Sequence, residues 1–212
     1  MTAGVRGWAV AAALALACGG CGHRPASEGA PPIDTSILRD VGTIEGDFMA
    51  RQRLSGAMGE HALAGDVVLQ KQGSTLTLLG LTPFGTRAFA VIQEGRALRV
   101  EAPPGAPLPF PPELMLVDVH RALFVGVGEG ALADGVHRRR LGGGEVVVET
   151  WSKGKLLRRV FEKRRGRPRG PITIEYGEGL SEGAPPREIA IDNARLGYRV
   201  TIETVSFQRL GG

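Results

Sequence analysis

The chain has 212 residues, which is enough for one domain with tails and excludes a large multidomain protein. Hydrophobic residues make up 42% of the sequence and aromatic residues only 5%, while 32 glycines and 14 prolines favour short strands and turns over long helices. A formal net charge of +4 and a sequence pI of about 9.5 favour an anionic membrane surface or an acidic partner.

The first residues have the pattern of an export signal. Arg6 precedes an uninterrupted apolar run over residues 8–17, which is too short to span a bilayer but has the length of a signal-peptide core. Small residues then precede Cys18, and this arrangement resembles the lipobox of bacterial lipoproteins. Cys21 is the second choice for acylation, and an ordinary secretory signal is the alternative. Export argues against nucleic acid as a partner.

We therefore expect a lipoprotein signal peptide over residues 1–17, an acylated flexible tether over 18–32 and a folded domain over 33–212. The tether is rich in Gly, Pro, Ala and Ser, which is typical of a flexible linker. The resemblance to lipoproteins implies a diacylglycerol thioether and an amide-linked acyl chain on the cysteine, and several acyl chains anchor a protein stably. The residue after Cys18 is Gly19 rather than the Asp of inner-membrane lipoproteins, which implies the outer membrane of a Gram-negative cell.

The first half of the domain is expected to contain a short helix and a meander of five strands. Asp34 and Thr35 are candidate caps for a helix over 33–41. Apolar alternation bounded by turn residues predicts antiparallel strands around 47–54, 66–71, 76–81, 89–91 and 97–101.

Thr82-Pro83-Phe84-Gly85 is predicted to form a tight turn between two of these strands, because Pro and Gly suit turn positions. Phe84 is unusual there, since connecting segments are normally polar. Either Phe84 folds back into a core, or it is an exposed apolar finger that contacts lipid or a partner.

The second half begins with a Pro-rich break over 103–112, which leads into a helix over 112–124. Leu116, Val119, Ala122 and Leu123 form its predicted apolar face, and His120 is expected to be partly exposed. The order of elements predicts an antiparallel α+β domain with one curved sheet and the helix across its concave side. The remaining strands are expected at 135–140, 145–152, 155–163, 172–176, 188–192 and 198–207.

Four motifs in this order resemble the LolA/LolB lipoprotein-carrier superfamily, and LolB most of all, together with a LolB-related lipoprotein family of unknown function. They are the lipobox at Cys18, the Leu-Thr-Pro-Phe-Gly of 81–85, the Pro-rich 107–114 before the helix, and the terminal 188–192 with 197–202. The second motif is similar to the Pro-Leu-Gly hairpin of LolB.

The resemblance implies an unclosed β-barrel with a helical lid over an apolar cavity that suits acyl chains. It also implies that Pro83, Phe84 and Gly85 form a membrane-insertion loop. Alternation along the strands and the helix gives the expected cavity lining, which is Val68, Leu76, Leu78, Phe89 and Val91 from strands, and Leu116, Val119 and Leu123 from the lid.

No pattern of catalytic or metal-binding residues is evident. The four histidines, His23, His61, His120 and His137, have no metal-ligand spacing with one another, and no Gly-x-Ser-x-Gly elbow occurs. We therefore expect no enzymatic activity, no cofactor and no metal. The basic tracts are either solvated loops or contacts for anionic headgroups; they lie at 138–140 and 163–169.

The sequence thus predicts a monomeric outer-membrane lipoprotein that binds an acylated ligand, a lipoprotein's acyl chains or another lipid, and helps to transfer it into the membrane. A periplasmic carrier is a candidate donor. The alternatives are a non-catalytic envelope scaffold that acts through its basic loops and, with less support, a hydrolase of envelope lipid.

Overall fold

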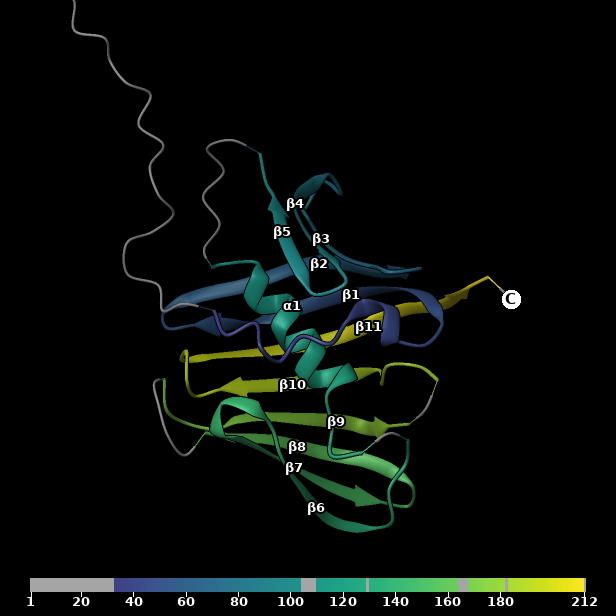
Figure 1. Ribbon diagram of the computed structural model, residues 1–212. Helices are drawn as coiled ribbons and strands as arrows, with labels where there is room; N and C mark the ends of the chain where they lie inside the picture. The colour runs from purple at the N-terminus through teal and green to yellow at the C-terminus, as the bar shows by residue number, and fades with distance from the viewer. Residues whose placement is uncertain (1–32, 104–109, 129, 164–167, 182, 212) are drawn as a thin grey trace, which may run out of the picture. The chain divides into compact units, whose positions relative to one another are not determined.

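A computed structural model describes residues 33–103, 110–128, 130–163, 168–181 and 183–211, and within them eleven antiparallel strands form one sheet (Figure 1). The order across the sheet is β5-β4-β3-β2-β1-β11-β10-β9-β8-β7-β6. The strands are β1 (Asp47–Met58), β2 (His61–Gln72), β3 (Thr75–Leu81), β4 (Arg87–Glu94), β5 (Ala97–Glu101), β6 (Gly135–Arg140), β7 (Glu145–Ser152), β8 (Lys155–Lys163), β9 (Ile172–Leu180), β10 (Glu188–Asn193) and β11 (Tyr198–Leu210).

The two edges of the sheet determine where the helix lies. Each strand pairs with its neighbours in sequence, except that β5 and β6 do not pair with each other and are the two edge strands. In the middle of the sheet β1 pairs with β11. The chain leaves the sheet at one edge and re-enters it at the other, so the connection crosses a face of the sheet. Helix α1 (Glu113–Val119) and the π-helical turn η2 (His120–Phe124) belong to this connection and lie in front of β1, β11 and β10 (Figure 1). The expected unclosed antiparallel sheet with a helical lid is confirmed.

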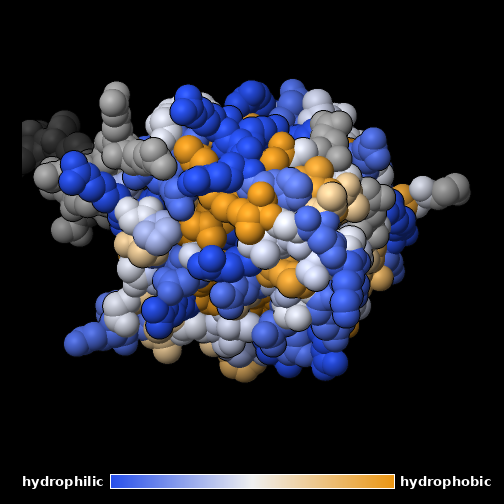
Figure 2. Space-filling model, turned by 90° about the horizontal axis from the view of Figure 1, so that it is seen from below, coloured by the Kyte–Doolittle hydropathy of each residue, from blue (hydrophilic) through white to orange (hydrophobic). Residues whose placement is uncertain are grey.

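The helix separates two apolar cores. Leu116 and Val119 pack with the buried residues of β1–β4, whereas Ala122 and Val125 pack with those of β7–β10. Figure 2, seen from the β6 side, shows apolar surface in the centre of that face with hydrophilic residues around it. Apolar surface therefore remains accessible, as is expected of a sheet that is not closed.

Two sequence-based predictions about the first half of the domain are wrong. Residues 33–40 form no helix, and only a short 3₁₀ turn, η1 (Val41–Thr43), follows them. Asp34 instead accepts hydrogen bonds from the backbone N–H and the hydroxyl of Ser36, at 3.1 and 2.6 Å, so its side chain stabilises a turn. Strand β2 also begins at His61 rather than at Asp66, which makes β1 and β2 a long hairpin.

The helix also departs from prediction at His120, which is fully buried rather than partly exposed. The backbone N–H of Arg39 donates to His120 Nδ1 at 3.1 Å, so the ring donates from Nε2 to the Gln93 side-chain oxygen at 2.7 Å. The Gln93 amide in turn donates to the carbonyls of Arg39 and Gly95. This network joins the segment before β1, the helix and β4, and it requires a neutral imidazole.

We predict that His120 makes stability depend on pH. Burial, with the nearby Arg39 charge as a smaller cause, lowers the pKa of His120 from 6.5 to about 4. Its contribution is therefore complete above pH 6.5 and is lost as the pH falls to about 4, a change of roughly 3 kcal/mol. Urea unfolding of the unacylated full chain (Cys18→Ser, Cys21→Ser), with and without His120→Gln, measures this contribution to the free energy of unfolding. The difference between the two proteins should shrink from pH 7.5 to 4.5, and a constant difference would contradict the prediction.

Candidate functional site

An apolar cavity of about 240 Å³ lies between the sheet and helix α1. Leu78, Phe89 and Val119, three of the residues named from the sequence, border it. The wall is almost entirely hydrocarbon, so the cavity can hold an apolar group but offers few polar partners. The full lining is Gln52, Leu54, Met58, Leu63, Ala64, Gly65, Asp66, Val67, Leu78, Gly80, Leu81, Ala88, Phe89, Phe110, Leu114, Met115, Asp118, Val119, Ile191, Tyr198, Val200 and Ile202.

The other predicted lining residues lie elsewhere. Leu76, Val91 and Leu116 are buried in the core beside the cavity without lining it, and Leu123 lines a second cavity. The prediction that Val68 lines the cavity is wrong. Val67 and Leu69 are buried residues of β2, and Val68 between them lies on the opposite face. Two adjacent valines make the phase of the alternation ambiguous, and a shift of one residue reverses the face.

Sequence reasoning missed the walls that come from the end of the chain. Val200 and Ile202 of β11 line the apolar cavity because β11 pairs with β1, about 150 positions away in the sequence. Their alternation indicated a buried face, but only the pairing of the two strands shows which cavity that face meets. The lid side was missed as well, at Phe110, Leu114 and Met115.

The turn that carries Phe84 connects the end of β3 to the start of β4, where Leu81 and Ala88 line the apolar cavity. The Thr82 N–H donates to the Thr86 carbonyl at 2.8 Å, and the two threonine hydroxyls lie 2.7 Å apart. Gly85 has a φ of +76°, a conformation that side chains other than glycine rarely adopt. The turn is thus closed by hydrogen bonds, and it holds Phe84 92% exposed.

A buried polar group interrupts the apolar wall at Asp118. Tyr198 donates its hydroxyl proton to Asp118 Oδ2, and Asn193 donates to the same hydroxyl at 2.9 Å. Asp118 Oδ1 lies 3.5 Å from the Arg121 guanidinium but accepts no hydrogen bond from the described residues. Burial raises the pKa of the Asp118 carboxyl. Burial and the neighbouring Asp118 also raise the pKa of the Tyr198 hydroxyl, so each group ionises less readily than it does in water.

The second, polar cavity has a volume of about 620 Å³ and lies beside η2. In its wall the Arg159 guanidinium donates to Glu149 at 2.7 Å and to the carbonyls of Arg121 and Ala122 at 2.6 and 2.9 Å. A positive charge at the carbonyl end of a helix is stabilising, and here it also fixes the lid to β8. The remaining charged residues that line the polar cavity are Arg39, Glu45 and Arg209.

Other residues named from the sequence do not converge on either cavity. Cys18 and Cys21 lie outside the described residues, as do the signal peptide and the tether. Arg138, Arg139 and Arg140 are exposed on the edge strand β6, where Arg138 pairs with Glu162 at 3.1 Å. In the described ranges no three His, Cys, Asp or Glu side chains gather as a metal site, and no helix there has the length and apolarity to cross a bilayer.

Over the described ranges, an eleven-stranded open sheet with one α-helix over an apolar cavity defines the class of fold. The chain belongs to the family described as protein of unknown function (DUF3261), whose model matches residues 49–206. This match begins within β1 and ends within β11, so it includes every lining residue of the apolar cavity. A search of curated proteins gave no significant match.

Solved structures that resemble the chain include a LolA superfamily protein from Nitrosomonas europaea, at 12% identity and a TM-score of 0.47, with 84% of this chain and 91% of that one covered. A candidate outer membrane lipoprotein-sorting domain from Vibrio parahaemolyticus gives 13% identity and a TM-score of 0.48, covering 79% of this chain and 86% of the other. Similarity at this level assigns no function to this chain.

We predict that Arg159→Met destabilises the protein by about 3–5 kcal/mol, because it leaves the Glu149 carboxylate buried without its partner. The double variant Glu149→Gln with Arg159→Met should lose less, since no unpaired charge remains. Equilibrium urea unfolding of both variants checks this. A double variant that is as unstable as the single one would show that the stranded charge is not the cause.

Proposed function

We propose that this protein is a lipid-anchored outer-membrane protein that holds an acylated ligand in the apolar cavity and helps to pass it into the membrane. The observation that carries the proposal is the apolar cavity itself, bounded by residues that lead directly into the turn of Phe84. The lipobox-like sequence at Cys18 and the resemblance to LolB support the location and the class of ligand. No catalytic step is part of this proposal.

The cavity suits an acyl chain on physical grounds. Moving a methylene group from water into an apolar site contributes about 0.8 kcal/mol, so a chain gains affinity from a hydrocarbon wall without specific polar contacts. The apolar cavity lies where helix α1, which covers the middle strands of the sheet, leaves space toward β2, β3 and β4. Side-chain packing alone does not fill this space.

Phe84 suits membrane contact. A phenylalanine that is 92% exposed gains nothing from the fold, whereas burial of such a side chain in an apolar phase is worth about 1.5–3 kcal/mol. The flanking Thr82 and Thr86 hydroxyls share a hydrogen bond, which lowers the cost of bringing these polar groups close to lipid.

The first test fills the cavity. Ala88 lines it and is only half-buried, so Ala88→Phe should occupy the space without disturbing the strand pairing. Native mass spectrometry with lipid extraction should find acylated ligand in the full-length protein and little in this variant. Ala97→Phe, on the exposed start of β5, is the matched control and should keep the ligand. A wild-type protein that is empty under these conditions would favour the scaffold alternative.

The second test separates binding from transfer. Phe84→Ala should keep the bound ligand but slow its transfer to phospholipid vesicles by about tenfold or more, because the aromatic tip no longer enters the bilayer. Transfer of a fluorescent acyl-labelled lipid from the full chain is the measurement. Val136→Ala, which alters another exposed apolar side chain on β6, is the control. Loss of bound ligand in Phe84→Ala would contradict the division of roles.

A further inference from the structure

The apolar cavity and the polar cavity follow each other along the two central strands. On β1, Leu54 and Met58 line the apolar cavity, whereas Phe48 and Ala50 line the polar one. The same division occurs on β11 and on β2. On β11 the apolar cavity is lined by Tyr198, Val200 and Ile202, and the polar cavity by Phe207 and Arg209. On β2 Val67 lines the apolar cavity and Leu69 the polar one.

One residue lines both cavities and stands where they meet on β1. Gln52 is 3% exposed and lies beside the bulge where the pairing of β1 with β11 shifts between Arg51 and Gln52. Its amide nitrogen has one partner among the described residues, the Thr204 hydroxyl at 3.5 Å, which is the limit of a hydrogen bond. Its amide oxygen accepts no hydrogen bond from them.

The Gln52 amide borders the cavity space, and among the described residues its only side-chain partner is the Thr204 hydroxyl at the limit of hydrogen-bond distance. Gln52 thus retains at least one donor and one acceptor at the junction of the cavities. A molecule that extends through the junction can satisfy them. The group that it places there must carry both an acceptor and a donor, as an ester carbonyl with a neighbouring hydroxyl does, or an amide.

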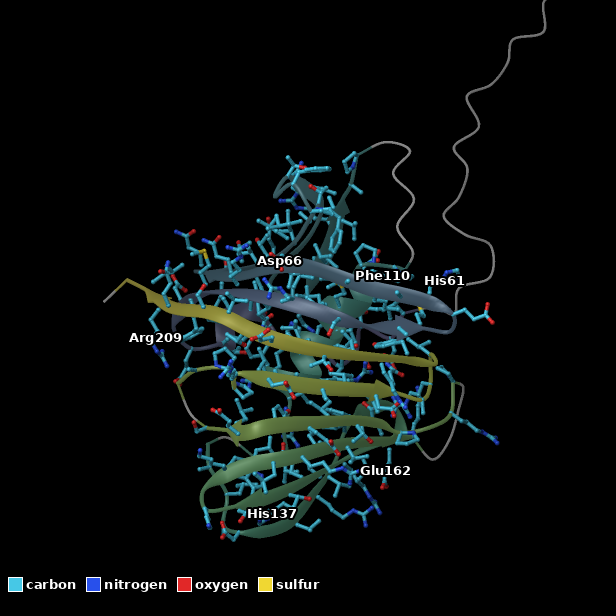
Figure 3. The ribbon with its side chains drawn as sticks, turned by 180° about the vertical axis from the view of Figure 1, so that it is seen from behind. His61, Asp66, Phe110, His137, Glu162 and Arg209 are labelled. Atoms are coloured by element: carbon cyan, nitrogen blue, oxygen red, sulfur yellow. The ribbon has the colours of Figure 1, made fainter. Side chains whose placement is uncertain are left out.

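The two cavities differ in chemistry in a way that orients such a molecule. The apolar cavity has hydrocarbon walls, while the polar cavity has Arg39, Glu45 and Arg209 among its lining residues. Phe110 and Arg209 lie toward opposite ends of the central strands (Figure 3). An amphiphile would therefore place its chain toward Phe110 and its headgroup toward Arg209.

The volume limits the number of chains. Pockets for drug-sized ligands usually measure about 300–1,000 Å³. At about 240 Å³ the apolar cavity lies below that range, so it cannot enclose the three chains of a mature lipoprotein together.

We propose that the ligand is a single-chain acyl ester or acyl amide that lies beneath the helical lid through both cavities, with its carbonyl group at Gln52. This inference rests on the proposed function and specifies its ligand. Gln52 Nε2 donates to the acyl carbonyl, and Gln52 Oε1 accepts from the neighbouring hydroxyl or amide N–H. The chemistry is shared by monoacyl phospholipids and by N-acylated peptide termini.

The test compares ligands with and without the carbonyl group. The probes are palmitoyl lysophosphatidylethanolamine, N-palmitoyl-glycylserine and the apolar dye N-phenyl-1-naphthylamine, which lacks a carbonyl, added to the unacylated full chain. In Gln52→Leu the affinity for the acyl probe or probes that bind the wild type should fall about tenfold, because their polar groups lose the amide. Dye binding should remain within about twofold, and the midpoint of urea unfolding should not decrease, since the one side-chain hydrogen bond that is lost is at the distance limit.

Two further variants complete the test. Gln52→Met keeps the length of the side chain and should behave as Gln52→Leu does. Thr204→Val removes the one side-chain partner that Gln52 has among the described residues, and it should leave acyl-probe affinity unchanged. If only the lysophospholipid binds, the natural ligand is a phospholipid; if only the N-palmitoyl peptide binds, it is an acylated protein.

Three results would overturn the inference. The first is equal affinity of wild type and Gln52→Leu for the acyl probes. The second is a marked loss of stability in both Gln52 variants, which would make the amide a structural group. The third is failure of wild type to bind the acyl probes while it binds the dye. If wild type binds none of the three, the proposed function itself fails.

Discussion

The structure depends on one topological constraint: the chain leaves the sheet at edge strand β5 and returns at the opposite edge strand β6. No short turn can make this connection, so a segment must cross the sheet, and an amphipathic helix is a stable way to do so. The cores on its two sides and the cavities beneath it follow from this crossing. A sheet closed into a barrel would have no edges to connect and no need of a lid.

The lid is held by buried polar groups at its C-terminal half. The imidazole of His120 joins it to the segment before β1 and to β4, and the guanidinium of Arg159 holds its last carbonyls to β8. The N-terminal half, with Leu114 and Met115, instead borders the apolar cavity. The helix is thus fixed where its backbone needs partners and meets open space where its side chains are apolar.

The sequence predicts the strands and the fold class well, because apolar alternation and Gly or Pro turns are local signals. It fails where the outcome depends on distant pairing. Val68 and Val67 are equivalent by composition, and only the register of β2 against β1 and β3 decides which is buried. His120 looks like an ordinary polar residue of a helix until Gln93 and the Arg39 backbone are brought to it. Gln52 has no local signal at all, since its position at the junction follows from a bulge against β11.

The pairing of β1 with β11 in the middle of the sheet has a consequence for folding. Each half of the chain is a series of local hairpins, but the strands that join the halves are the first and the last of the domain. Contacts between residues so distant in sequence form slowly, because bringing them together costs loop-closure entropy. Neither cavity has a complete wall until β11 is in place, so both cavities stay incomplete until the first and last strands of the domain have paired.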